Sequence, residues 1–464
     1  MASTSIPDVR IVSTTRIPLL RRPPPHLEQI PLSLFDAWFL PQPPIQRLFL
    51  YSDADGDTSS LIESLKSSLA DVIAVYFPLA GKLTHVASTG DVVIDCSPSA
   101  VGDGVAFVEA EADGYDARAM SAGERQDVAA FLRLLPALEA DELPAPVLAV
   151  QATRFVAGGG GGVAVGVAVH HAVVDGHSFW RFMDAWSAAA CRGRRLANPP
   201  SPVFDRSAIV LPMAADVARR ILRKVTPELP RLPTENLLRR TWEHHDTSTL
   251  ELDRRRIAGI KNRIAKLNDD RPLPSTFVAV SALVWSTIVR ARSTLAGGGV
   301  ADAARAHLVF LGDCRPRLHP PVDAAYFGNC IRGCVAEAAA RDLAGGDDDG
   351  GGGIGVARAR DAIEDAVEAF VARPMEAFET WLDGVGELIR QPAGSFVAVT
   401  ASPRFDAYAA DLGWAAPSRV EFVSESAPEG MVVVTGGKKE GSVQVSACLR
   451  KEVMEAFRSH VLDW

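Results

Sequence analysis

The 464-residue chain contains few cysteines, and none of them is placed as a metal-ligand or redox motif requires. No two of them form a CxxC pair. Zinc sites and disulfide frameworks depend on closely spaced or regularly paired cysteines, so this distribution argues against both. We predict free, buried thiols in a reducing compartment and no bound metal ion. The six are Cys96, Cys191, Cys314, Cys330, Cys334 and Cys448.

Long apolar runs and basic blocks are also missing. No stretch reaches the roughly 18 unbroken apolar residues that a membrane-spanning helix needs, and the N-terminal segment lacks the continuous apolar core of a secretory signal. Lys and Arg total 48 against 57 Asp and Glu, and they are nowhere dense enough to neutralise a phosphate backbone. We therefore expect a soluble, cytoplasmic protein whose partners include neither nucleic acid nor membrane.

Apolar residues make up 47% of the chain, which is enough for two domains that each bury a core. The segment 197–240 is rich in proline and arginine and is typical of a linker. We accordingly divide the chain into an N-terminal domain (1–196), a crossover linker (197–240) and a C-terminal domain (241–464).

Helix and strand signals alternate along both halves. The sequence TSSLIESLKSSLADVI, from residue 58, carries apolar residues at helical spacing, with Asp57 or Thr58 as N-cap. PVLAVQATRFVA and GVAVGVAVHHA flank a run of glycines as two strands flank a hairpin loop. In the second half, HHDTSTLELD predicts a strand, and RRIAGIKNRIAKLN and STFVAVSALVWSTIVRARS predict helices.

The stretch VAVGVAVHHAVVDGHS, residues 163–178, combines a very apolar strand with two histidines. Alternate residues of a strand face opposite sides, and here both sides are apolar, which predicts a central strand. Aromatic residues at helical spacing follow, with Asp175 or Ser178 as cap. This strand, turn and helix would hold His171 and Asp175 rigidly at one corner, with Gly176 allowing the turn its backbone conformation.

A histidine in this position suits general-base catalysis, because its pKa lies near neutrality. A structural histidine is the alternative. Metal binding by His170 and His171 is disfavoured because adjacent strand residues point to opposite faces. The chain has no GxSxG elbow for a covalent acyl-enzyme. From spacing alone, Asp175 could either hydrogen-bond the imidazole or pair with an arginine.

These residues resemble the plant BAHD acyltransferases, CoA-dependent enzymes related in fold to chloramphenicol acetyltransferase. HHAVVDG matches their HxxxDG signature, and DLGWAAP, beginning at Asp411, is similar to their second signature, DFGWG. LSLFDAWFLPQPPIQRLFLY, FPLAGKL and STFVAVSALVWS look like further landmarks of the family. YFGNC is typical of the branch that acylates anthocyanins and phenolic glucosides.

The resemblance implies an α/β fold of two similar domains, each a mixed sheet flanked by helices, with a solvent channel between them. The N-terminal domain would carry HxxxD and the C-terminal domain DLGWA. His171 would be the catalytic base. Asp175 would point away from the site and pair with Arg315, or as second choice with Arg317.

The second signature would support the site structurally through Asp411, Gly413 and Trp414. It departs from the family at Leu412 and Ala415. Regions that match the family's CoA contacts are Lys261, Ser275, Thr276 and Ser402. Each of these four also has a plain interpretation as a helix cap or a solvated surface residue.

The implied reaction moves an acyl group from CoA, a co-substrate, to a hydroxyl of a phenolic or flavonoid glucoside or to an arylamine, within a ternary complex. We expect a monomer without a permanently bound cofactor. Some malonyl-transferring relatives hold the malonyl carboxylate with an arginine four residues after the signature aspartate. That position is Phe179 here, which favours an aromatic acyl group, hydroxycinnamoyl or benzoyl, over malonyl.

Three alternatives remain open at the level of sequence. An N-acyltransferase specific for tryptamine or tyramine would make phenolamides, and the acidic net charge of −9 slightly favours such cationic acceptors. A condensation-type domain would take its acyl group from a carrier protein. A non-catalytic binding paralogue would keep the scaffold without the reaction.

Overall fold

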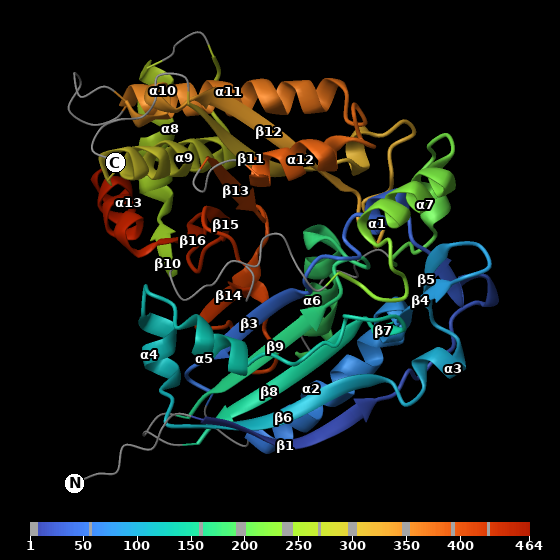
Figure 1. Ribbon diagram of the computed structural model, residues 1–464. Helices are drawn as coiled ribbons and strands as arrows, with labels where there is room; N and C mark the ends of the chain where they lie inside the picture. Colours follow the sequence, from blue (N-terminus) through green and yellow to red (C-terminus); the bar gives the residue numbers. More distant parts are fainter. Residues whose placement is uncertain are drawn as a thin grey trace.

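The computed structural model describes residues 8–54, 58–156, 161–191, 201–233, 245–267, 271–295, 304–345, 353–390, 395–424 and 427–464. These residues form two six-stranded mixed sheets and one small four-stranded sheet. The first large sheet occupies the lower part of Figure 1 and the second the upper part, and α6 lies near the middle of the view. The architecture is the α/β arrangement that the sequence predicted.

The first sheet has the strand order β1-β6-β8-β9-β3-β14. Only β6 and β8 pair in parallel, and the other pairs are antiparallel. The strands are β1 (Asp8–Ile17), β3 (Ile45–Tyr51), β6 (Val105–Asp113), β8 (Leu148–Phe155), β9 (Val163–Val169) and β14 (Arg419–Val423).

Strand β9 leads to the histidine pair, and it is central, as predicted. It lies between β8 and β3, and all of its residues are buried. β8 and β9 pair in antiparallel register from Leu148 opposite Val169 to Arg154 opposite Val163, which confirms the hairpin. A strand that is buried on both faces and paired on both edges holds its end in one place.

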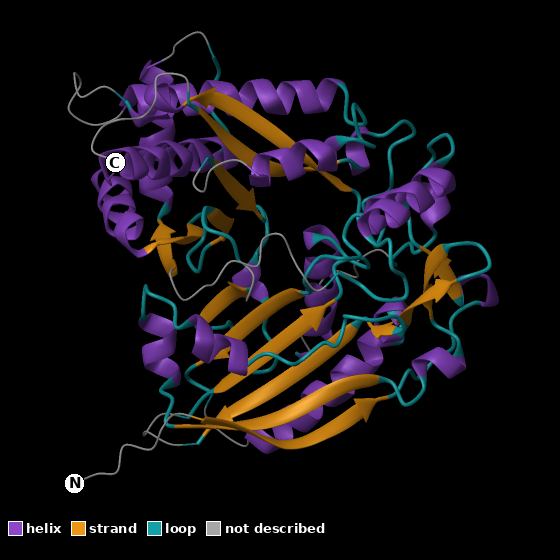
Figure 2. Cartoon of the chain, in the orientation of Figure 1, coloured by secondary structure: helices purple, strands orange, loops and turns teal. Residues whose placement is uncertain are grey.

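The second sheet has the strand order β10-β16-β15-β13-β11-β12. β13 pairs in parallel with both β11 and β15. Figure 2 shows helices gathered around this sheet. The strands are β10 (His245–Leu252), β11 (Arg305–Asp313), β12 (Ile331–Ala339), β13 (Phe396–Thr400), β15 (Met431–Gly436) and β16 (Val443–Arg450).

The small sheet pairs β2-β5-β4-β7 beside the first large sheet. Its strands are β2 (Gln29–Pro31), β4 (Lys82–Val86), β5 (Asp91–Asp95) and β7 (Ala145–Pro146). The helices of the first half are α1 (Leu34–Ala37), α2 (Thr58–Ile73), α3 (Pro98–Val101), α4 (Ala117–Ala122), α5 (Val128–Arg133), α6 (Gly176–Ala190) and α7 (Ala214–Val225).

The predicted helices are confirmed. α2 begins at Thr58 and buries Leu65 and Leu69 of its apolar stripe, whereas Asp57 lies outside the described residues. α9 is buried without a break from Val278 to Val289. The helices of the second half are α8 (Arg254–Leu267), α9 (Thr276–Leu295), α10 (Ala340–Ala344), α11 (Gly353–Ala372), α12 (Trp381–Arg390) and α13 (Lys451–Asp463).

One strand crosses the expected division between the halves. β14 belongs to the C-terminal part of the sequence, but it pairs with β3 at the edge of the first sheet, Arg419 opposite Leu50 through Val423 opposite Gln46. The expectation that each half builds its own sheet therefore needs this correction. A five-residue strand has no local signal for its partner, since pairing is decided by long-range contacts. The boundaries at 196 and 240 remain a prediction.

All six cysteines are free thiols, and five of them are buried. Within the part of the chain that the structure describes, no helix is both long and apolar enough to cross a bilayer.

Candidate active site

The site is built at the corner between β9 and α6. β9 ends at Val169, and the next residues turn, with the His170 amide donating to Val147 O at 2.8 Å and the Val173 amide to His170 O at 3.0 Å. α6 begins at Gly176, with Asp175 as its N-cap. His171 and Asp175 are therefore held by a buried strand on one side and a helix on the other.

The imidazole of His171 stacks on the ring of Phe39, with centroids 4.1 Å apart and planes 9° from parallel. Its Nδ1 atom is buried and has no hydrogen-bond partner among the described residues. The backbone carbonyl of His171 accepts from Asn329 Nδ2 at 2.8 Å. The ring is thus fixed through its face and its backbone, while its Nδ1 makes no hydrogen bond to the described residues.

Burial lowers the pKa of His171 to about 4, because the charged imidazolium is poorly solvated there. The negative charge of Asp175 opposes this shift only in part, and the positive charge of Arg47 adds to it. At neutral pH the imidazole is therefore uncharged. An uncharged imidazole is the form that can accept a proton.

Asp175 turns away from the imidazole. Its Oδ2 forms an ion pair with Arg315 Nη1 at 2.8 Å and accepts from the Cys330 amide at 3.1 Å, and its Oδ1 accepts from the Ser178 amide at 2.9 Å. The structure pairs Asp175 with Arg315 and not with Arg317, which donates to the Asp313 carbonyl at 2.6 Å. Asp175 is thereby tied to three separate segments.

The electrostatics of this pair explain its burial. Desolvation by itself would raise the pKa of Asp175, but the charge and hydrogen bonds of Arg315 hold that pKa below its usual value. Arg315 also donates to Gly328 O at 2.8 Å. Both side chains are almost fully buried, and each supplies the counter-charge that the other needs.

A second buried carboxylate, Asp36, was missed by the sequence-based prediction. It accepts from the Asn329 amide at 2.9 Å, from Asn329 Nδ2 at 3.0 Å and from Arg206 Nε at 3.0 Å. Because Asn329 in turn holds the His171 carbonyl, this network joins α1 to the histidine turn. A charged residue inside the apolar LSLFDAWFL and an asparagine inside YFGNC were the available signals.

His170 has a different environment from its neighbour. It is buried, and its Nδ1 accepts from the Ala172 amide at 3.2 Å. Burial lowers the pKa of His170 to about 3. The described residues contain no group of three or more His, Cys, Asp or Glu side chains that could hold a metal ion.

The reason for a glycine at position 176 differs from the prediction. Gly176 is not among the residues with positive φ, so the turn does not need its backbone freedom. A Cβ atom there would instead lie 2.9 Å from Cε2 of Phe405. Space for the Phe405 ring, and not an unusual backbone conformation, accounts for this glycine.

The second signature lies at the other end of α6. The Asp411 carbonyl accepts from Ser187 Oγ at 2.8 Å, and the Trp414 ring lies 5.4 Å from that of Tyr51. Ser187 is twelve residues beyond Asp175, or about 18 Å along a helix. Gly413 has a φ of 104° and Ala415 a φ of 66°, so both adopt conformations that favour glycine.

The four residues matched to CoA contacts all come from the second half of the chain, and the described contacts do not join their side chains to one another. Lys261 is half-buried on α8. Ser275 Oγ accepts from the Val278 amide at 3.2 Å, as a helix cap does, and Thr276 begins α9. Ser402 follows β13, where its Oγ accepts from the Arg404 amide at 3.2 Å.

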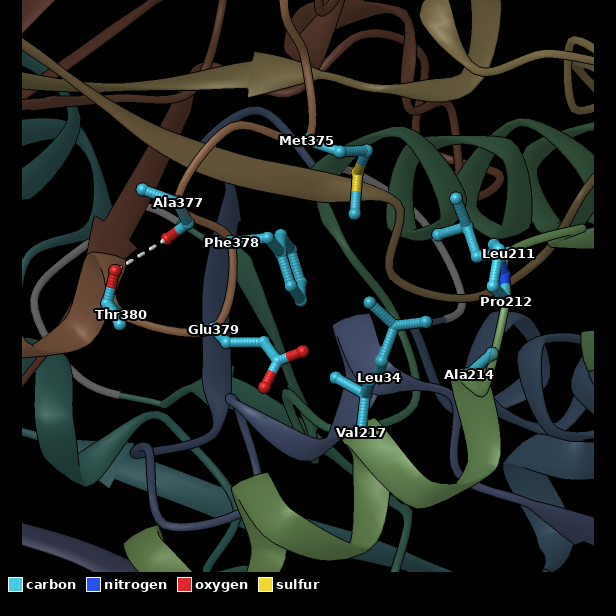
Figure 3. A pocket seen from close by; sticks show the side chains of 10 residues that line it. All are labelled: Leu34, Leu211, Pro212, Ala214, Val217, Met375, Ala377, Phe378, Glu379 and Thr380. Carbon is cyan, nitrogen blue, oxygen red and sulfur yellow. Dashed lines mark hydrogen bonds between the residues drawn. The ribbon is translucent and has the colours of Figure 1, made fainter.

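A pocket of about 350 Å³ lies near α1 and α7, and His171 is not among its lining residues. Figure 3 shows Leu34 and Val217 opposite Phe378 and Glu379. The Phe378 ring also packs 6.3 Å from that of Trp38, so the pocket wall adjoins the segment that carries Phe39. A narrower cavity of about 30 Å³ lies between residues of both halves and is bordered by Phe422.

Comparisons with known proteins agree with this architecture. A profile described as the Transferase family matches residues 9–463. The chain is 29% identical over 450 residues to phenolic glucoside malonyltransferase 2 of Arabidopsis thaliana, covering 94% of this chain and 93% of that protein. It is 28% identical over 412 residues to a hydroxycinnamoyl-CoA:5-hydroxyanthranilate N-hydroxycinnamoyltransferase of Avena sativa, covering 86% of each.

Among solved structures, vinorine synthase is similar with a TM-score of 0.70 at 20% identity, covering 98% of both chains. F. sporotrichioides TRI101, solved in complex with coenzyme A and T-2, is similar with a TM-score of 0.64 at 16% identity, covering 93% of this chain and 97% of that one. At these identities the likeness shows the fold alone.

The fold and the matched family together define the class: the chain belongs to the Transferase family. Within it, the chain is a BAHD acyltransferase of the anthocyanin and phenolic glucoside branch, and acyl-CoA is its co-substrate.

Proposed function

We propose that His171 is the general base of an acyl transfer from CoA to a phenolic or flavonoid glucoside hydroxyl or an arylamine. The observation that carries this proposal is the geometry of one ring at the end of a buried strand: it is stacked on Phe39, and its Nδ1 is without a partner among the described residues.

The step is a direct displacement in a ternary complex. His171 takes the proton from the acceptor O–H or N–H while the acceptor atom bonds to the thioester carbonyl carbon. The tetrahedral intermediate then collapses, the C–S bond breaks, and the CoA thiolate receives the proton from His171. The product is an ester or amide with free CoA, and the protein returns to its starting state.

The other site residues take positioning and binding roles in this proposal. Asp175 and Arg315 hold the turn without touching the reacting atoms, and Asp36 and Asn329 hold the carbonyl of His171. Asp411 holds the far end of α6 through Ser187, the Gly413 amide donates to Asp411, and Trp414 packs on Tyr51 of β3. For CoA we propose Lys261, Ser275, Thr276 and Ser402, whose cationic and hydroxyl groups suit phosphates and amides.

The names of the relatives support both kinds of acceptor. An anthocyanidin glucoside relative from Arabidopsis thaliana is named as an O-malonyltransferase, and the Avena sativa enzyme is named as an N-hydroxycinnamoyltransferase. We place the acceptor on the side of Phe39, next to the apolar pocket near α1. We also propose that the enzyme works as a cytoplasmic monomer without a permanently bound cofactor.

Replacing His171 tests the proposal directly. We expect His171→Ala to lower kcat by about 10²-fold or more with every donor, which is the usual contribution of general-base catalysis. His170→Asn is the matched control, because the ring of His170 is next to His171 in the chain and is proposed to have no part in the reaction. Unchanged turnover in His171→Ala would reject the base assignment, whereas absence of turnover in the wild-type protein with every donor and acceptor would favour the binding paralogue.

Donor and acceptor are identified in one matrix of reactions. Benzoyl-, coumaroyl-, feruloyl- and malonyl-CoA are each offered with phenolic glucosides and with tryptamine or tyramine, and products are identified by mass spectrometry. We expect transfer from free acyl-CoA. Transfer that required a carrier protein as donor would contradict the proposal, and exclusive acylation of amines would select the N-acyltransferase alternative.

A further inference from the structure

Arg47 carries a positive charge beside the proposed active site that no carboxylate of the described residues neutralises. It lies on β3, which pairs with β9 on one side and β14 on the other. Arg47 lies opposite Val167, two residues before the end of the strand that leads to His171, and its charge helps to lower the pKa of that histidine. A cation in such a setting normally has an anionic partner.

The contacts of the Arg47 side chain are aromatic. Its guanidinium lies 3.9 Å from the ring centre of Phe422 and 5.6 Å from that of Phe179. Nη1 donates to the backbone carbonyl of Gln46 at 2.8 Å, and Nε is buried without a partner. Burial lowers the pKa of Arg47 to about 9, and no nearby acid offsets that effect.

The nearest carboxylate along the neighbouring strand is engaged elsewhere. Glu421 precedes Phe422 on β14, and successive strand residues point to opposite faces. Its carboxylate accepts from Arg419 Nε at 2.5 Å and from Thr249 Oγ1 at 3.2 Å. Phe422, directly opposite Arg47 in the register, therefore shares a face with Arg47, and Glu421 does not.

The position of Phe179 relates the Arg47 cation to substrate binding. Phe179 is four residues after Asp175, where an arginine would be expected if a malonyl carboxylate were held from α6. The sequence alone therefore favoured an uncharged acyl group. In the folded chain, however, a guanidinium from β3 lies against the ring at this same position.

We propose that Arg47 binds a substrate carboxylate next to His171, and that it does so in place of an arginine at position 179. A guanidinium presents two parallel N–H groups that match a carboxylate. A malonyl group has its carboxylate two bonds from the thioester carbonyl carbon, so a guanidinium that binds this carboxylate must lie close to the reacting carbon. This inference rests on the proposed function, since it locates the acyl group beside the base.

The carboxylate could belong to the donor or to the acceptor, and two arms of one experiment separate these sources. In the donor arm, malonyl-CoA and acetyl-CoA are titrated into the full chain without acceptor, and heats of binding are measured. In the acceptor arm, anthranilate and its methyl ester are compared as acceptors with acetyl-CoA as donor. Each arm uses wild type, Arg47→Gln, Arg47→Lys and the exposed control Arg10→Gln.

For a donor carboxylate, we expect Arg47→Gln to weaken malonyl-CoA binding by about tenfold or more and acetyl-CoA binding by about twofold or less, as for a lost charge-assisted hydrogen bond. Arg47→Lys should give an intermediate loss of malonyl-CoA affinity, because lysine keeps the positive charge but lacks the two parallel N–H groups that match a carboxylate. Arg10→Gln should match wild type. A selective loss for anthranilate over its ester would assign the same site to the acceptor.

Equal changes with charged and uncharged substrates in both arms would overturn the proposal, because Arg47 would then only support the fold. Thermal melting of each variant checks folding, and Arg47→Lys retains the charge if Arg47→Gln proves unstable. Binding of malonyl-CoA is measured without turnover. Failure of the Arg47 site is thus distinguishable from failure of His171 as base, which only the turnover of His171→Ala reports.

Discussion

His171 and Phe39 lie face to face, with ring centroids 4.1 Å apart and planes 9° from parallel. The two residues are far apart in sequence: Phe39 follows α1, and His171 follows β9. Stacking fixes the plane of the imidazole while leaving Nδ1 without a hydrogen bond. A base can therefore be held in one orientation by a group that does not compete for its proton.

Loss of this ring should lower the rate. Phe39→Leu removes a stacking contact of about 0.5–1.5 kcal/mol, so we expect kcat to decrease about 2- to 10-fold. Phe39→Tyr keeps the stacked ring and should retain most of the wild-type rate. Steady-state kinetics at saturating acyl-CoA measure both. Equal losses in the two variants would show that the ring face is not what positions His171.

The Asp175–Arg315 pair should contribute mainly to stability. Asp175→Asn leaves the buried guanidinium of Arg315 without its main counter-charge, and we expect a loss of about 3 kcal/mol in the free energy of unfolding. Arg317→Gln is the matched control and should cost about 1 kcal/mol or less, because Arg317 is only half-buried and makes no ion pair with Asp175. Urea unfolding compares the two. Similar losses would contradict a special role for Arg315.

Buried His170 should make the fold sensitive to acid. The unfolded chain binds a proton on this residue near its ordinary pKa of 6.5, whereas the folded chain binds it only near pH 3. The unfolded state therefore holds more protons between these values, and stability decreases as the pH falls through them. The loss from this one residue should reach about 2 kcal/mol at pH 5 relative to pH 8.

His170→Asn keeps an acceptor for the Ala172 amide but does not titrate. We expect its unfolding free energy to vary less between pH 8 and pH 5 than that of wild type. Urea titrations at several pH values measure the difference. Parallel pH dependences in the two proteins would mean that other groups cause the acid sensitivity.

Replacing Ala415 by glycine should stabilise the folded protein. Its φ of 66° lies in the left-handed region, which costs a residue with a Cβ about 1–2 kcal/mol. Part of that gain is offset by the greater freedom of glycine in the unfolded chain. We expect Ala415→Gly to stabilise the protein by about 0.5–1 kcal/mol.

Neighbouring Ala416 is the control, because it is exposed and is not among the residues with positive φ. Ala416→Gly adds only unfolded-state freedom and should destabilise the protein slightly. Thermal melting distinguishes the pair. A lower melting temperature for Ala415→Gly than for wild type would contradict the prediction.

Local patterns in the sequence were sufficient for the elements around the site. The alternation of valine with small residues predicted a central strand, and β9 is central because both of its faces are apolar. Apolar spacing likewise predicted α2, α6, α8 and α9. His171 was identified as a candidate because a titratable side chain directly after a wholly apolar strand is unusual and points to a function.

Contacts between distant segments were decided only by the tertiary structure. The sequence left Asp175 a choice of partner, and packing placed Arg315 against it. It attributed Gly176 to the backbone, whereas the ring of Phe405 leaves no room for a Cβ. The predicted division assigned residues 419–423 to the C-terminal domain, and long-range pairing put the strand that they form, β14, beside β3.

The positive charge of Arg47 near His171 also depends on tertiary structure and not on local sequence. The sequence by itself determined that α6 carries an apolar ring, and no charge, at position 179. The guanidinium of Arg47 reaches that ring from β3, which is more than a hundred residues away in the chain. Periodicity reports which face of an element is buried, but only the pairing of strands and helices determines which charges then meet.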